Sequence, residues 1–77
     1  MSDLKVRITA KESAMKRGHL DLICDVTHSD MIYNKILRMT DGDERTAENV
    51  TDWVGCASAG EIMEFSDGKV EIERRSA

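Results

Sequence analysis

The strongest local signal in the sequence is a β-hairpin close to the C-terminus. Two short stretches of alternating apolar and polar residues, 62–66 and 69–73, flank the dipeptide Asp67-Gly68. Asp-Gly is a preferred loop in tight hairpins, because its residues tolerate the positive φ that a type I′ turn requires. A chain that contains this segment is therefore expected to build a sheet.

The loop also predicts the register of the hairpin. On one side the apolar residues pair across the strands, Phe65 with Val70 and Met63 with Ile72. On the other side Glu64 lies opposite Glu71, with Glu73 beside them. Like charges that face each other across a hairpin cost up to about 1 kcal/mol. This side is therefore either neutralised by Lys5 or Arg7 from a neighbouring strand or available to a basic partner.

Two further strands are expected in the N-terminal third. Residues 4–10 alternate strictly between apolar and polar side chains, which is typical of a strand with one buried face. Residues 19–26 alternate again, with Ile23 as the one apolar residue on the outward face. Between them, residues 11–18 break the alternation and are interpreted as a polar connection that ends at Gly18.

The middle of the chain favours two helices. Ser29 is a suitable N-cap, Asp30 complements the positive end of the helix dipole, and Asp41-Gly42 ends the first helix. Its apolar face consists of residues at helical spacing: Ile32, Tyr33, Ile36, Leu37 and Thr40.

The second helix is expected to start with Thr46 as its N-cap and to end near Gly60. Glu44 and Glu48 lie near its positive end. Its apolar face repeats with helical spacing at Val50, Trp53, Val54 and Ala57.

These elements predict an α+β fold with the order ββααββ. The simplest architecture that buries the apolar faces of these elements is a four-stranded, mainly antiparallel sheet with both helices packed on one face. Residues 1–77 are too few for more than one core, so we expect a single domain. A core this small has no room for a deep cofactor cavity. Any site is expected on the surface, in a shallow groove or between protomers, with no cofactor.

The apolar runs and the cysteine content of the chain indicate in which compartment we expect the protein. No apolar run approaches the roughly 18 residues that a membrane span needs, and residues 1–5 carry no apolar signal segment. We therefore expect a cytoplasmic protein without membrane association. The two cysteines, Cys24 and Cys56, cannot form the dense disulfide framework of a small secreted scaffold.

The sequence offers little catalytic or metal-binding chemistry. Cys24 and His28 are four residues apart, and they can meet only if the strand ends near Thr27. A zinc site built from Cys24, His28, Cys56 and His19 lacks paired C-x-x-C ligands. We expect neither an enzyme nor a metal protein. A small Cys/His metal or thiol protein remains an alternative.

Charge is distributed unevenly along the chain. Residues 1–38 carry a net charge of +2 and residues 39–77 a net charge of −6, which together give the total of −4. The acidic residues that we expect to bind a partner lie in two clusters: Asp41, Asp43, Glu44, Glu48 and Asp52 around the second helix, and Glu64, Glu71 and Glu73 on the hairpin. Such clusters are suited to a partner with a basic surface.

The function expected from these features is a non-enzymatic protein-binding module, an adaptor or an inhibitor. Small proteins of this kind are common among phage- and mobile-element-encoded genes. The alternative is a small nucleic-acid-binding domain that uses Lys5, Arg7, Lys16 and Arg17. Nucleic acid is the less favoured partner because the overall balance is acidic. A homodimer is compatible with the thin core and with an outer strand that can pair with its copy.

Overall fold

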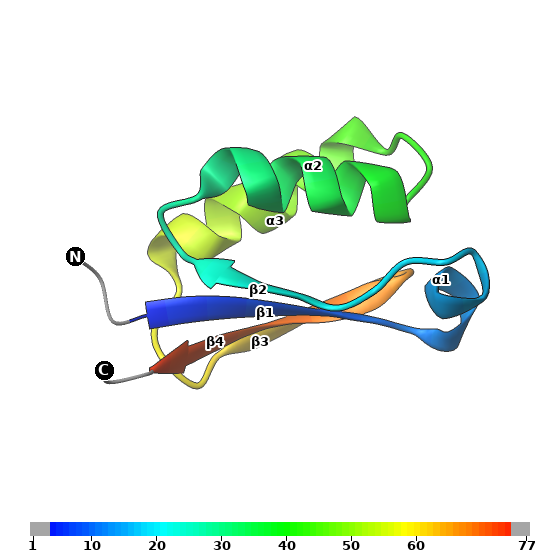
Figure 1. The fold of residues 1–77 in the computed structure, drawn as a ribbon. Helices are drawn as coiled ribbons and strands as arrows, with labels where there is room; N and C mark the ends of the chain where they lie inside the picture. The colour runs from blue at the N-terminus through cyan, green and yellow to red at the C-terminus, as the bar shows by residue number, and fades with distance from the viewer. Residues whose placement is uncertain (1–3, 75–77) are drawn as a thin grey trace.

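A computed structural model describes residues 4–74, which contain four strands and three helices (Figure 1). In chain order they are β1 (Leu4–Ala10), α1 (Glu12–Lys16), β2 (Leu22–Asp25), α2 (Ser29–Met39), α3 (Glu44–Cys56), β3 (Ile62–Phe65) and β4 (Gly68–Arg74). Of the elements expected from the sequence, the strand at residues 4–10 has the predicted bounds.

The four strands form one antiparallel sheet in the order β2-β1-β4-β3. The helices α2 and α3 lie together on one face of this sheet (Figure 1). The expected α+β architecture is therefore confirmed. The outer strands are β2 and β3, and each contains only four residues.

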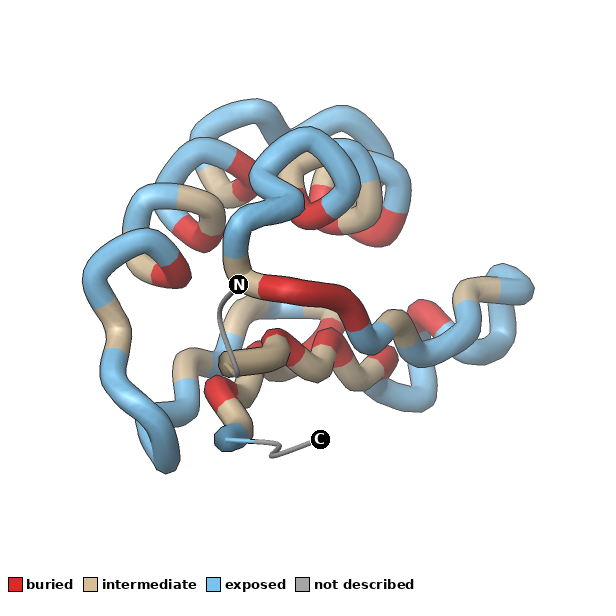
Figure 2. The backbone as a smooth tube through the Cα atoms, turned by 60° about the vertical axis from the view of Figure 1, so that its left-hand side comes forward, coloured by how far each residue is buried: buried red, intermediate tan, exposed pale blue. Residues whose placement is uncertain are grey.

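The hydrophobic core fills the space between the sheet and the two helices. Alternate residues of the two central strands point toward the helices and are buried, as the period of a strand requires. The core is completed by the buried faces of both helices, so that its main members are Val6, Ile8, Val70, Ile72, Ile32, Ile36, Met39, Ala47, Val50 and Val54. Figure 2 shows these buried positions on the inner sides of the helices and strands.

The predicted hairpin register is wrong by two residues. The two turn residues are Ser66 and Asp67, and Gly68 is the first residue of β4, paired with Phe65. Gly68 has no positive φ. It is required instead because a Cβ atom there would collide with the carbonyl oxygen of Thr9 on β1.

The shifted register changes which charges face each other. Glu64 pairs with Lys69, and Ile62 pairs with Glu71. The predicted opposition of Glu64 and Glu71 therefore does not occur.

Two other expectations from the N-terminal third differ from the structure. The presumed polar connection contains α1, a five-residue helix too short to show a helical repeat, and it is held to the core by the fully buried Ala14. The second strand is shorter than residues 19–26. Before it, the carboxylate of Asp21 accepts a hydrogen bond from the backbone N–H of Ala10 (3.1 Å) instead of extending the strand pairing.

The ends of the two long helices also differ. Ser29 was expected to be the N-cap of α2 but is its first residue, and the N-cap position is His28, whose side chain makes no capping hydrogen bond. α3 is capped by Asp43 and not by Thr46, because the Asp43 carboxylate accepts from the Thr46 backbone N–H. It ends at Cys56, several residues before Gly60.

Candidate protein-binding surface

The outer face of α3 carries a row of three acidic side chains. Glu44, Glu48 and Asp52 are four residues apart, and this spacing places them on one side of the helix. All three are exposed, and none forms an ion pair with a Lys or Arg of residues 4–74. We call these three residues the α3 acidic stripe. Their charge is left for solvent or a partner to compensate.

An aromatic side chain borders the stripe. Tyr33 of α2 is half-buried, and burial raises the pKa of its hydroxyl. The carboxylates of Glu44 and Glu48 raise this pKa further, which places both of them within electrostatic reach of the Tyr33 hydroxyl. The surface thus combines an acidic row with the neighbouring aromatic ring of Tyr33, whose hydroxyl keeps its proton at neutral pH.

The two remaining acids of this cluster shape the turn between α2 and α3. Asp43 accepts hydrogen bonds from the backbone N–H of Thr46 (3.2 Å) and from its hydroxyl (2.7 Å). These bonds, the hydroxyl bond first, hold the pKa of the Asp43 carboxyl below its usual value. Asp41 adopts a positive φ of 58°, which a short polar residue tolerates in a tight turn. The sequence pattern grouped these two with the stripe, but Asp43 is engaged in the helix cap, and Asp41 is exposed and shapes the turn through its backbone.

The second predicted cluster lies on the other side of the molecule. Glu64, Glu71 and Glu73 belong to the sheet face that points away from the helices, because Val70 and Ile72 point toward them. Each of the three acids has a basic neighbour: Lys11 at 3.8 Å from Glu64, Lys69 at 3.1 Å from Glu71, and Arg7 at 3.1 Å from Glu73. The structure therefore separates the predicted site residues into an unneutralised stripe and a neutralised hairpin face.

The basic residues considered for nucleic-acid binding are also ion-paired. The four pairs are Lys5 with Asp25 at 3.3 Å, Arg7 with Glu73 at 3.1 Å, Lys16 with Glu12 at 3.5 Å, and Arg17 with Asp67 at 3.0 Å. A phosphate backbone would have to compete with these carboxylates.

The thiols and imidazoles do not gather at one place. Cys24 is buried in β2, where burial raises the pKa of its thiol and the neighbouring Asp25 raises it further. Cys56 is exposed at the end of α3. Among residues 4–74, no group of three or more His, Cys, Asp or Glu side chains is placed to hold a metal ion. No helix in this range is long and apolar enough to cross a membrane.

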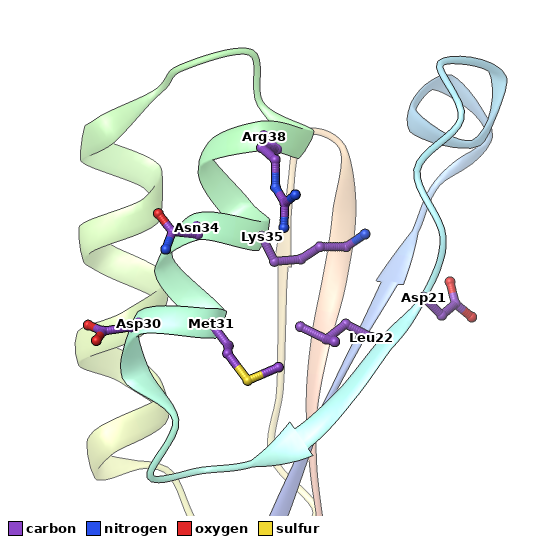
Figure 3. Close-up of a pocket in the computed structure, with 7 residues that line it drawn as sticks. All are labelled: Asp21, Leu22, Asp30, Met31, Asn34, Lys35 and Arg38. Carbon is purple, nitrogen blue, oxygen red and sulfur yellow. The ribbon is translucent and has the colours of Figure 1, made fainter.

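Sequence reasoning missed an open groove between β2 and α2. Its volume is about 300 Å³, and it is lined by Asp21, Leu22, Asp30, Met31, Asn34, Lys35 and Arg38 (Figure 3). The figure shows Met31 and Leu22 pointing toward each other across it. The sequence pattern held no signal for this groove, because Ile23, the outward apolar residue of this strand, pairs with Arg7 on the sheet face away from α2.

Comparison with known proteins gives no functional lead: no family model, no curated protein and no solved structure matches the chain.

Proposed function

We propose that the protein is a non-enzymatic protein-binding module that docks the α3 acidic stripe on a basic surface of another protein. The observation that carries this proposal is the contrast between the two acidic clusters. The hairpin acids each have a basic neighbour, whereas Glu44, Glu48 and Asp52 have none among the described residues. Three like charges in one row on a helix disfavour that helix, and a binding role accounts for their presence.

The chemistry of the stripe favours arginine in the partner. Guanidinium groups bind carboxylates through two parallel hydrogen bonds, and they also stack on aromatic rings. Glu44, Glu48 and Tyr33 offer both features side by side. A partner segment with arginines spaced along a helix or an extended chain would match the four-residue spacing of the stripe.

An adaptor or an inhibitor would use such a surface in the same way, by occupying a basic site on its target. A cytoplasmic location and a phage or mobile-element origin stay predictions.

A labelled-protein titration tests the proposal directly. An arginine-rich peptide is added to uniformly ¹⁵N-labelled protein, and backbone amide shifts are followed by NMR. We expect shifts concentrated on α3 and around Tyr33, and affinity that falls steeply as salt is raised. Shifts concentrated on the hairpin face, or spread evenly over all acidic residues, would contradict the proposal.

Matched charge variants complete the test. The variant Glu44→Lys/Glu48→Lys removes most of the stripe, and Glu12→Lys/Glu64→Lys changes the net charge equally at exposed acids elsewhere. The ion pairs that the control loses are exposed and contribute little to stability. We expect peptide binding to be lost in the first variant and retained in the second. Labelled DNA and RNA serve as further probes, and tight binding to either in both variants would favour the nucleic-acid alternative.

A further inference from the structure

The edge strand β2 is short, with four residues, but it contains no proline and no exposed charge that would keep it from pairing. Natural sheets protect their edges with exposed charges, proline or bulges. The opposite edge, β3, has such a charge, since the side chain of Glu64 is 70 % exposed. In β2 the only charged residue is Asp25, whose side chain is 10 % exposed and bound to Lys5 and Thr27. Residues 22–25 therefore present no exposed charge at the free edge, and the nearest one is Asp21 directly before the strand, whose carboxylate accepts a hydrogen bond from the Ala10 backbone N–H (3.1 Å).

Exposed apolar side chains surround this edge. Leu20, two residues before β2, is 77 % exposed, and Met31 of α2 is 48 % exposed. Ile23 of β2 is 42 % exposed on the other face of the sheet, where it pairs with Arg7. Met31 lies over the groove between β2 and α2, together with the half-buried Leu22 (Figure 3). Scattered exposed apolar residues are normal, but a cluster along an open strand indicates an interaction site.

The groove has an acidic residue at one end of α2 and a basic residue at the other, so a second copy of the protein in the opposite orientation would place unlike charges together. Asp30 lies at the start of α2, Arg38 near its end, and Asn34 halfway between the two in the sequence. Neither Asp30 nor Arg38 forms an ion pair within the part of the chain that the structure describes, and the same holds for Lys35. Burial lowers the pKa of Lys35 and the nearby Arg38 lowers it further, while the carboxylate of Asp21, which lines the same groove, acts in the opposite direction and offsets them only in part.

We infer that β2 and this groove form the interface of a symmetric homodimer. In a two-fold dimer the β2 strands of the two copies pair antiparallel, and the two α2 helices face each other across the seam. Asp30 of one copy then lies opposite Arg38 of the second copy, on both sides of an axis that passes close to Asn34. The charge order along α2 selects this occupant over an unrelated peptide, because the antiparallel arrangement satisfies both ends of the groove at once.

The dimer also accounts for the apolar residues. If the β2 strands pair about Leu22, then Leu20 of each copy lies against the β2 strand of the other. The long side chains of Met31, Lys35 and Arg38 extend from both helices over the joined strands. The α3 acidic stripe lies on a different helix, outside this interface. The dimer therefore does not depend on the proposed function, and each can fail without the other.

A charge-swap experiment tests this inference. Molar mass is measured by light scattering and sedimentation over protein concentrations up to about 1 mM, which detects even weak association. We expect the wild type to dimerise. Asp30→Arg and Arg38→Asp alone each bring like charges together twice per dimer and should raise the dissociation constant at least about tenfold. The double variant Asp30→Arg/Arg38→Asp restores both pairs and should restore the dimer.

This rescue cannot arise from a more stable α2. Both substitutions oppose the helix dipole, so the double variant is expected to have the less stable helix and yet the stronger dimer. The control variant Glu48→Lys changes a charge on α3 and should leave the dissociation constant unchanged. A wild-type protein that stays monomeric throughout, or a double variant that associates no better than the single ones, would overturn the inference.

Cross-linking locates the axis independently. In a Cys56→Ser background, Asn34→Cys places one exposed thiol at the expected axis, and a short bis-maleimide should link two copies efficiently. Asn49→Cys in the same background places the thiol on the exposed side of α3. Equal cross-linking of the two variants would show that the copies do not meet through α2, and would overturn the proposed interface.

Discussion

Gly68 lies where β1, β4 and the end of α2 come closest together. A Cβ atom at this position would meet the carbonyl oxygen of Thr9, the Met39 side chain at 3.0 Å and the Phe65 ring at 3.1 Å. Backbone and core atoms cannot move far, because protein interiors are closely packed. The glycine is therefore needed for close approach between strands.

Replacing this residue tests that reason. We expect Gly68→Ala to lower the free energy of unfolding by about 1–3 kcal/mol through overpacking, measured by urea denaturation. Gly55 is the matched control, since it lies inside α3 with nothing near its Cβ position. Gly55→Ala should stabilise the protein by about 0.5–1 kcal/mol. Equal effects of the two substitutions would contradict the packing argument.

Asp25 makes stability depend on pH in the acid range. Its carboxylate accepts from the backbone N–H and the hydroxyl of Thr27 (3.0 and 2.8 Å), and these bonds, assisted by Lys5, lower its pKa from 3.8 to about 2. Because the folded pKa is depressed, the unfolded chain binds the proton more readily. The stabilisation by Asp25 is present above pH 4 and is lost as the pH falls toward 2.

Thermal unfolding between pH 2 and pH 5 measures this dependence. In Asp25→Asn the melting temperature should fall less steeply with decreasing pH than in the wild type. Thr27→Val keeps the backbone hydrogen bond and removes only that of the hydroxyl, so its slope should be intermediate. A wild-type slope in Asp25→Asn would show that other carboxyls dominate acid unfolding.

At the scale of elements, α3 has a better defined start than α2. Asp43 caps α3 through Thr46, whereas the side chain of His28 makes no capping bond to α2. We expect Asp43→Ala to lower the free energy of unfolding by about 1 kcal/mol, and Asp43→Asn to lower it by much less because the amide oxygen still accepts. Denaturant titration measures both. If both variants lost the same stability, the charge of Asp43 would matter more than its cap.

The α3 acidic stripe is expected to reduce the stability of its own helix. Glu48 has like charges four residues away on both sides, Glu44 and Asp52. Glu48→Lys replaces two repulsive pairs with attractive ones and should stabilise the protein by about 0.5–1 kcal/mol while weakening docking. Asn49→Lys, which adds a positive charge next to this position, is the control and should have the smaller effect in urea denaturation. A loss of stability in Glu48→Lys would contradict a repulsive stripe.

At the scale of the whole molecule, Arg17 connects three segments that are far apart in sequence. Its guanidinium donates to the backbone carbonyl of Met39 at the end of α2 (2.7 Å) and to Asp67 in the β3–β4 turn (3.0 Å). The Lys11 N–H also donates to the Asp67 carbonyl (2.9 Å). Together these contacts join the α1 segment to the end of α2 and to the β3–β4 turn.

Removing Arg17 should therefore affect distant regions together. We expect Arg17→Ala to lower the free energy of unfolding by about 1 kcal/mol, a value reduced by partial exposure of the bonds. Hydrogen exchange should quicken both in the hairpin turn and at the end of α2. Arg17→Lys keeps the charge but not the two-point geometry and should recover part of the loss. Faster exchange confined to α1 would show that Arg17 does not couple these segments.

Much of the fold was predictable because its determinants are local. Strict alternation defined the strand at residues 4–10, and helical spacing defined the faces of α2 and α3. The hairpin register was not predictable, because Gly68 is explained by Thr9, a residue from a strand far away in the sequence. The helix α1 was missed because one turn and a half shows no periodicity, and only the burial of Ala14 holds it in place.

For the candidate surfaces, the sequence by itself determined where the acidic residues lie along the chain and that three of them share one side of a helix. Only the tertiary structure decided which acids are neutralised. The strand order places β1 beside β4, and this brings Arg7 next to Glu73, while no strand or loop of residues 4–74 brings a basic partner to the α3 acidic stripe. The same order leaves β2 at the edge. Strand pairing joins residues far apart in the chain, so the periodicity of any one segment carries no information about its neighbour in the sheet.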